Sequence, residues 1–202
     1  MIQYSETVVN EFAPQLWDFT SIKCPSVGIV LPPVHSLMWN IANRRVLLGQ
    51  FNDAQNTLVR QYARRCIYAA KSYGSMRKSL RLYFKDFKRD QPKLAHYFNA
   101  LADAESCILH LHIMIDALNG LGSKSLLDDH FPQYKTANDF SNNIKHLAGQ
   151  LKGGAYNKNR FLPVYFVDAG ISNGKTVLAF SEMQKLIRGN GKVVMSIYRH
   201  SA

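Results

Sequence analysis

The sequence predicts a mainly α-helical protein, an antiparallel helical bundle with a small C-terminal β-hairpin or three-strand element. Over two long central segments, apolar residues recur at steps of three and four, as on one face of a helix. After about residue 160 the pattern changes to short β-prone runs separated by Asn, Gly and Ser. We therefore expect an irregular lead-in over residues 1–34, a bundle over 35–152, and an α+β element over 153–202 that packs on the bundle.

The bundle is expected to contain four helices. The first should cover residues 36–50. The second should cover 54–89, with Gly74-Ser75 bending or splitting it, since glycine weakens a helix interior. The third should begin after Pro92, cover 93–119 and end at a glycine suited to a left-handed cap. Two long amphipathic helices joined by a short turn should form an antiparallel hairpin. A shorter helix is expected over 137–151.

The C-terminal element is expected to combine strands with a short helix. Strands are predicted at Leu162–Val167 and Lys175–Phe180, joined through Ser172-Asn173-Gly174 as a hairpin. A helix should follow from Ser181 to Arg188. Asn190-Gly191 is typical of a turn, and Lys192–Tyr198 is predicted as the third strand. Turn geometry is also the expected role of Gly170 and Gly189.

Composition indicates an ordinary globular chain of 202 residues, with 47% hydrophobic and 19% charged residues. We expect no secretory signal, because the first residues lack a basic region followed by an apolar run. No run of eighteen apolar residues exists, so no membrane association is expected. Three widely separated cysteines do not suit a disulfide framework. Reduced thiols and a cytoplasmic location are the simplest interpretation.

The positive charge is segregated along the chain. Residues 59–93 contain eleven Lys and Arg against two Asp, and residues 145–202 contain nine against Asp168 and Glu182. Such segregation favours a polyanionic partner, with nucleic acid before membrane. The residues expected to contact phosphates are Arg60, Arg64, Lys71, Lys78, Arg81, Lys85, Lys152, Lys158 and Arg160.

Aromatic residues lie among these cations, and most of them belong to the apolar face. The residues that follow its periodicity, and are expected in the core, are Tyr62, Tyr73, Tyr83 and Phe87. Only Tyr68 and Phe84 lie off that face. Nucleic-acid binders combine phosphate contacts with base stacking, and aromatic residues among cations would serve both.

Metal and cofactor chemistry find no support in the motifs. His110 and His112 are two residues apart, so on a helix they point about 200° away from each other and cannot share a metal. One of them should lie near the core and the other near the surface. No Walker A loop, nucleophile elbow or dinucleotide fingerprint is present. We expect neither a metal nor a cofactor.

One stretch suggests a family. Residues 139–154 read DFSNNIKHLAGQLKGG, and their N-x-I-K-H, after a bundle of longer amphipathic helices, resembles the HEPN domains. The resemblance covers about residues 36–150. It implies a four- to five-helix bundle of the kind found in prokaryotic toxin and phage-defence systems. Active members are metal-independent endoribonucleases that usually dimerise, and inactive relatives bind RNA or a partner protein. Their signature is an arginine followed, after four to six residues, by a histidine.

The resemblance makes His146 the candidate family histidine, with Lys145 and Asn142 beside it. Histidine moves protons near neutral pH, and a fixed cation would stabilise the phosphorane. However, Asp139, Phe140 and Ser141 occupy the positions of the signature arginine. The cation would then come from Lys145, Lys152, Lys158, Arg160 or a second subunit. Alternatively, His146 and the asparagines only line the solvated end of a helix.

A literal match to the signature spacing lies elsewhere, at Arg89-Asp90 followed by His96. Pro92 lies between them, so they belong to two helices joined at a turn. We therefore expect an RNA-directed protein, either a ribonuclease or an RNA-binding component of a toxin or phage-defence system. It would act as a homodimer or with a partner protein. The alternative is a non-enzymatic interaction protein whose basic faces dock an acidic partner.

Overall fold

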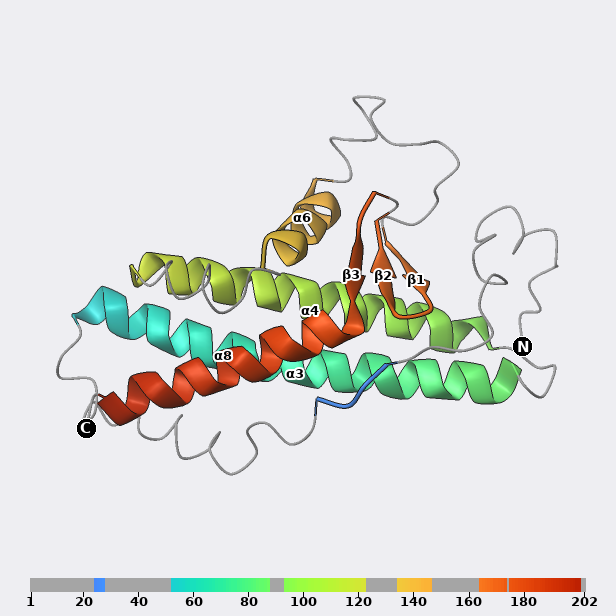
Figure 1. Cartoon of the computed structure of the whole chain (residues 1–202), viewed down its shortest axis with the longest axis horizontal. Helices are drawn as coiled ribbons and strands as arrows, with labels where there is room; N and C mark the ends of the chain where they lie inside the picture. The colour runs from blue at the N-terminus through green and yellow to red at the C-terminus, as the bar shows by residue number, and fades with distance from the viewer. Residues whose placement is uncertain are drawn as a thin grey trace.

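The computed structural model describes residues 24–27, 52–87, 93–122, 134–146, 164–173 and 175–200. Within these ranges the chain forms four helices and a three-stranded antiparallel sheet (Figure 1). This confirms the predicted fold class. The expected helix over 36–50 and the expected boundaries near residues 34 and 152 lie outside the described residues.

Helix α3 extends from Asp53 to Phe87 and is the central element. It begins with a capping box, in which the Asn52 N–H donates to Gln55 Oε1 (3.1 Å) and the Gln55 N–H donates to Asn52 Oδ1 (2.9 Å). The helix continues through Gly74-Ser75, so the expected split does not occur. One unbroken helix therefore presents both the apolar face and the cations predicted from the sequence.

Helix α4, from Leu94 to Gly120, packs antiparallel beside α3 (Figure 1). Tyr83 of α3 lies against Tyr97 at one end of the pair, with ring centroids 5.6 Å apart, and Arg65 meets His110 towards the other. Gly122 follows α4 with a φ of 72°, the left-handed conformation that glycine adopts without strain. The predicted hairpin and its glycine cap are both confirmed.

The core lies where α3, α4 and α8 meet. The α3 tyrosines at positions 62, 73 and 83 are fully buried, which confirms their prediction as core residues. The Phe87 side chain lies outside the described part of the structure. Phe166 of the sheet lies 5.4 Å from the Tyr97 ring and 6.2 Å from the Phe180 ring, measured between centroids. The sheet is thereby joined to the helical core.

Helix α6, from Tyr134 to Lys145, begins earlier than predicted and lies over α4 (Figure 1). Ala137, Phe140 and Ser141 are buried, and Ile144 packs against the core. Residues 147–151, which were expected to continue this helix, lie outside the described residues. The buried face of α6 anchors the segment on which the family resemblance was based.

The sheet consists of β1 (Tyr165–Val167), β2 (Gly170–Ser172) and β3 (Val177–Ala179), in the order β1-β2-β3. The predicted pairing of the first strand with the strand near 177 is therefore wrong, because β2 lies between them. Gly170 belongs to β2 rather than to a turn. A Cβ there would lie 2.4 Å from the Leu178 carbonyl oxygen, so the close approach of β3 requires glycine.

Helix α8 extends from Phe180 to His200, and this overturns three expectations. The strand predicted at Lys192–Tyr198 is helical, and Asn190-Gly191 and Gly189 lie inside the helix instead of forming turns. The reason is tertiary. Asn190 is fully buried and donates from Nδ2 to the Leu186 carbonyl oxygen (2.7 Å), while its Oδ1 accepts from the Tyr62 hydroxyl. A turn-forming residue is thus satisfied within a helix.

Candidate nucleic-acid interface

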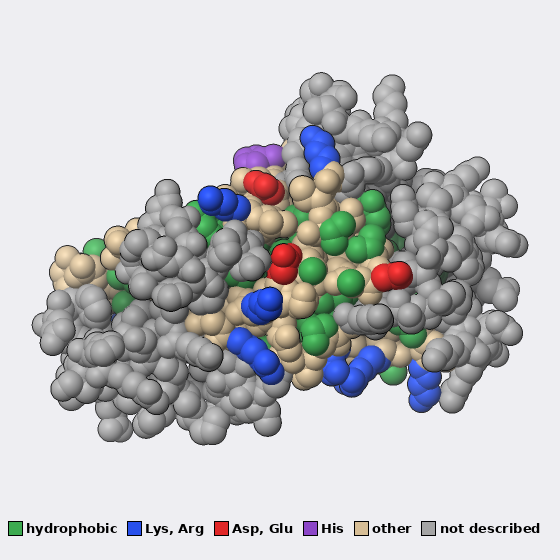
Figure 2. Space-filling model, in the orientation of Figure 1, with side chains coloured by type: hydrophobic (Ala, Val, Ile, Leu, Met, Phe, Trp, Pro, Cys, Tyr) green, Lys and Arg blue, Asp and Glu red, His purple; other side chains and the backbone are tan. Residues whose placement is uncertain are grey.

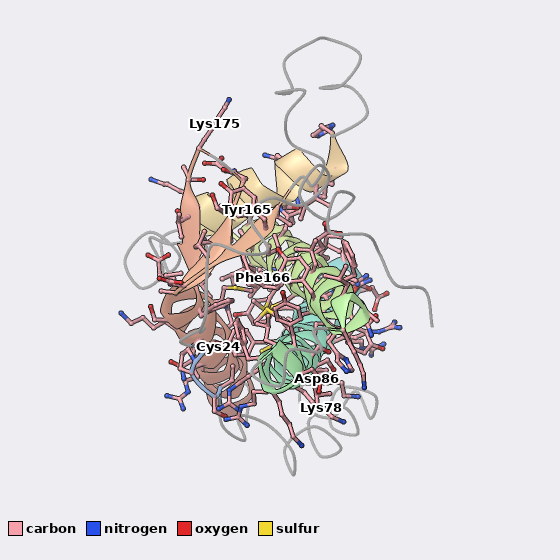
Figure 3. The ribbon with its side chains drawn as sticks, turned by 90° about the vertical axis from the view of Figure 1, so that its right-hand side faces the viewer. Cys24, Lys78, Asp86, Tyr165, Phe166 and Lys175 are labelled. Carbon is pink, nitrogen blue, oxygen red and sulfur yellow. The ribbon has the colours of Figure 1, made fainter. Side chains whose placement is uncertain are left out.

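The exposed side of α3 carries six of the predicted phosphate-contacting residues, which we call the basic stripe: Arg60, Arg64, Lys71, Lys78, Arg81 and Lys85. At 100° per residue they fall within an arc of about 100°, opposite the buried face. Arg60 is half-buried and the other five are exposed. Figure 3 shows Lys78 on the side of α3 that faces away from Phe166. The cations therefore lie on the face of α3 opposite the core, and their contact with phosphates stays a prediction.

The stripe is long and its positive charge is not neutralised within its own helix. From Arg60 to Lys85 the helix rises about 38 Å, at 1.5 Å per residue. Residues 54–85 include eight Lys and Arg and no Asp or Glu. Helix α4 has the opposite character, with Asp103, Glu105 and Asp116 and no Lys or Arg. The two helices therefore separate charge, and the positive field is concentrated on the α3 side.

Other cations extend the positive surface. Exposed Lys185 and Arg188 lie on α8. Figure 2 shows Lys and Arg side chains along the lower border of the molecular face, where Figure 1 places α3 and α8. Lys175, in the turn before β3, projects in the opposite direction from Lys78 (Figure 3). Lys152, Lys158 and Arg160 lie outside the described residues.

At one point the stripe continues into a cluster that includes a histidine, formed by Arg64, Arg65, Tyr68 and His110. Arg64 donates from Nε to the Tyr68 hydroxyl (3.2 Å), and its guanidinium lies 5.3 Å from the centre of that ring. The Tyr68 ring lies 5.3 Å from the His110 ring. Arg65 Nη1 is 3.2 Å from His110 Nδ1. We call this group the Arg65–His110 cluster.

The electrostatics of the cluster favour a neutral imidazole. Burial lowers the pKa of His110, and the adjacent Arg65 guanidinium lowers it further. Because a guanidinium only donates, His110 Nδ1 accepts and its proton is assigned to Nε2. The hydrogen bond from Arg64 and that residue's positive charge lower the pKa of Tyr68. A neutral imidazole, an acidified phenol and two guanidiniums are thus gathered within one surface feature.

Arg65 also retains an unused donor. Its Nε is buried and has no hydrogen-bond partner among the described residues. A buried guanidinium nitrogen without an acceptor is costly unless an acceptor arrives. A phosphate oxygen is the acceptor that a guanidinium binds best.

The predicted catalytic residues of α6 are not brought together with an arginine in the described structure. Asn142, Lys145 and His146 are exposed at the end of the helix. The His146 N–H donates to the Asn142 carbonyl oxygen (2.9 Å), which continues the helical pattern by one residue. No hydrogen bond or ion pair between described residues involves their side chains. This geometry matches the solvated helix end that the sequence left open as the alternative.

The second predicted pair is separated as well. Arg89 lies outside the described residues. His96 Nε2 lies 3.5 Å from Asp86 Oδ2, which Lys93 Nζ also approaches to 3.8 Å. Asp86 lies in the last turn of α3, and Lys93 and His96 lie at the start of α4, so this group joins the two ends of the hairpin. The arrangement gives His96 a structural role.

Sequence reasoning missed the pairing of Arg65 with His110. It did predict that one of the two nearby histidines would be buried and the other nearer the surface, and His112 is indeed buried while His110 is half-buried. The partner of His110 lies 45 residues away on another helix. Only the register of the α3–α4 hairpin brings Arg65 and His110 together. The sequence contained one signal of this contact, because each residue lies at the border of the apolar face of its helix.

Metal chemistry finds no support in the described ranges. They contain no group of three or more His, Cys, Asp or Glu side chains placed to hold a metal ion. None of the helices in these ranges combines the length and the apolarity needed to cross a membrane.

Comparison of the chain with protein-family models, curated proteins and solved structures finds no significant match. The resemblance to HEPN domains therefore stays a prediction.

Proposed function

We propose that this protein binds RNA along the basic stripe of α3. The observation that carries this proposal is the unbroken row of cations, about 38 Å long, on a helix without a carboxylate between Asp53 and Asp86. A row of this length can contact several successive phosphates, and each contact releases a counterion. The adjoining Tyr68 ring offers a face on which an unpaired base can stack. Single-stranded RNA fits both features.

The test measures the affinity for a labelled single-stranded RNA by fluorescence anisotropy at several salt concentrations. Six phosphate contacts predict a log–log salt slope of up to about −4, at about 0.7 per contact. The double variant Lys71→Glu/Lys78→Glu should bind at least about tenfold more weakly and with a shallower slope. The matched control Lys135→Glu/Lys175→Glu makes the same change of charge on α6 and in the turn before β3, and it should retain most of the affinity.

An affinity that does not depend on salt would reject RNA binding through phosphate contacts. An equal loss of affinity in both double variants would reject the basic stripe as the binding site. If polyglutamate bound as tightly as RNA, the stripe would instead be a docking face for an acidic protein, the alternative function predicted from the sequence.

A second candidate function is cleavage of the bound RNA at the Arg65–His110 cluster, and the contact between Arg65 and His110 favours it. A phosphate that attracts the Arg65 guanidinium would release His110 Nδ1, whose neutral imidazole is then a free base. The Tyr68 hydroxyl accepts from Arg64, so its own proton is available to a leaving group. A base, an acid and a fixed cation are the groups that metal-independent transesterification needs.

The proposed step can be written in full. The 2′-oxygen forms a bond to phosphorus while its proton passes to His110 Nδ1, and Arg65 stabilises the charge of the phosphorane. The bond from phosphorus to the 5′-oxygen of the next nucleotide breaks, and that oxygen takes the Tyr68 proton. The products are a 2′,3′-cyclic phosphate and a free 5′-hydroxyl. No external reactant is required.

Cleavage is tested with purified protein and a labelled RNA in EDTA. His110→Ala and Arg65→Ala should each reduce cleavage at least about a hundredfold, the scale of a positioned acid or base. His146→Ala and His96→Ala are the matched comparisons, because the sequence favoured those histidines. A loss confined to His146→Ala would move the site to α6. A protein that binds RNA but leaves it intact would be an RNA-binding protein without this activity.

A further inference from the structure

Residues 24–27, with the sequence Cys-Pro-Ser-Val, lie as an extended segment against α3 and α8 (Figures 1 and 3). Each of their four consecutive carbonyl oxygens accepts a hydrogen bond from a side chain. On α3, Arg77 Nε donates to the Cys24 oxygen (3.0 Å) and the Tyr73 hydroxyl to the Pro25 oxygen (2.9 Å). The other two donors are on α8.

Those two α8 donors complete a regular arrangement. Gln184 Nε2 donates to the Ser26 oxygen, and Arg188 Nε donates to the Val27 oxygen (2.8 Å). On each helix the two donors are four residues apart, so they lie on one face. Together the four donors line the site that residues 24–27 occupy, which we call the α3–α8 groove.

Recognition in this groove is directed mainly at the backbone. Ser26 is exposed, and Pro25 has no N–H that would need a partner. Val27 is 7% exposed and belongs to the core, and half-buried Cys24 packs against it. An extended peptide with proline at its second position and an aliphatic residue at its fourth meets these requirements. Backbone bonds combined with one side-chain pocket are typical of sites that bind extended peptides.

We propose that the α3–α8 groove is a peptide-binding site that residues 24–27 fill in cis, and that the same segment of a second copy can fill it in trans. The four donors and the core contact of Val27 are complementary to residues 24–27, and every copy of the chain carries both this segment and the groove. Side-chain donors that bind carbonyl oxygens do not distinguish the two sources. The cis segment is favoured by its high effective concentration, so exchange between copies requires high protein concentration or a weakened cis segment.

The first test uses the native protein and a peptide with the sequence of residues 23–28 in which serine replaces Cys24. The readout is the labelling rate of Cys24 by a thiol reagent, since Cys66 and Cys107 are fully buried. A peptide that displaces the cis segment should accelerate Cys24 labelling at least threefold. A control peptide with aspartate in place of Val27 should not. No acceleration at millimolar peptide, or equal acceleration by both peptides, would overturn the proposal.

The second test separates the segment from the groove in full-length chains. Val27→Asp gives a defective segment beside an intact groove, and Arg77→Ala/Arg188→Ala gives an intact segment beside a defective groove. Light scattering should find each variant monomeric alone and a heterodimer on mixing. Monomers in the mixture, or dimers of either variant alone, would contradict exchange through this groove. If circular dichroism shows that Val27→Asp is unfolded, Val27→Ala serves as the segment variant.

Discussion

The Tyr62 hydroxyl on α3 donates a hydrogen bond to Asn190 Oδ1 on α8, and neither side chain is accessible to solvent. Asn190 Nδ2 donates in turn to the Leu186 carbonyl oxygen within its own helix. A buried amide can lie between two helices only where both of its polar atoms have partners. This pair therefore fixes the register between α3 and α8, and with it the position of the groove that holds residues 24–27.

Replacing Tyr62 with phenylalanine should destabilise the protein. The substitution preserves the ring but removes the donor to Asn190 Oδ1, and a buried acceptor left without a partner costs about 1–3 kcal/mol. Urea unfolding measures the change, with the slope m expected to stay constant. Tyr68→Phe is the matched control, since the half-buried Tyr68 should change stability by less than about 0.5 kcal/mol. Equal effects of the two substitutions would show that the Tyr62 bond does not stabilise the core.

Two glycine-to-alanine substitutions should change the free energy of unfolding in opposite directions. Gly170→Ala should lower it and Gly74→Ala should raise it. A Cβ at Gly170 would lie 2.4 Å from the Leu178 oxygen and 2.9 Å from Ala179 Cα. Strand β3 must therefore move, which should destabilise the folded state by about 1–3 kcal/mol. A Cβ at Gly74 meets nothing within 4 Å, and alanine favours the helix by about 0.5–1 kcal/mol. Chemical denaturation of both variants measures the two signs. A stable Gly170→Ala protein would contradict the close packing of β2 against β3.

The free energy of unfolding should decrease as the pH becomes mildly acidic, and protonation of His110 should contribute to this decrease. Burial and Arg65 lower the pKa of His110 in the folded state, so below a pH of about 6.5 the unfolded chain binds the proton first. The folded state therefore loses stability as the pH falls from about 6.5 through the lowered pKa. His110→Gln should flatten this dependence slightly, because the ring is half-exposed and solvent screens it. Thermal unfolding of both proteins between pH 5 and 8 measures the difference, and parallel curves would show that His110 does not contribute.

Two substitutions of Tyr68 should separate binding from cleavage. Tyr68→Ala removes the stacking surface and should weaken binding to single-stranded RNA by about 1–3 kcal/mol. Tyr68→Phe retains the ring and removes the hydroxyl, so it should bind normally while any cleavage slows. Affinity and single-turnover cleavage rates measured on the same RNA test both outcomes. Binding unchanged in Tyr68→Ala would exclude base stacking at this position.

Local features predicted most of the helical part of the fold. The three- and four-residue periodicity of α3 placed Tyr62, Tyr73 and Tyr83 in the core, and Gly122 marked the end of α4. Both signals depend only on residues that are close in the sequence. The same periodicity placed Lys71 and Lys78 on the opposite, exposed face. In the sheet the strand order could not be predicted, because short strands are selected by their partners as much as by their own residues.

Helical period and charge are local properties, so the order of residues along the chain was enough to predict the α3–α4 hairpin, the buried apolar face and the basic stripe. The position of Asn190 inside a helix depends instead on tertiary packing, since its partner Tyr62 is 128 residues away. The contact between Arg65 and His110 depends on tertiary packing as well. It requires a particular register between two helices that pack side by side, and the composition of either helix does not specify this register.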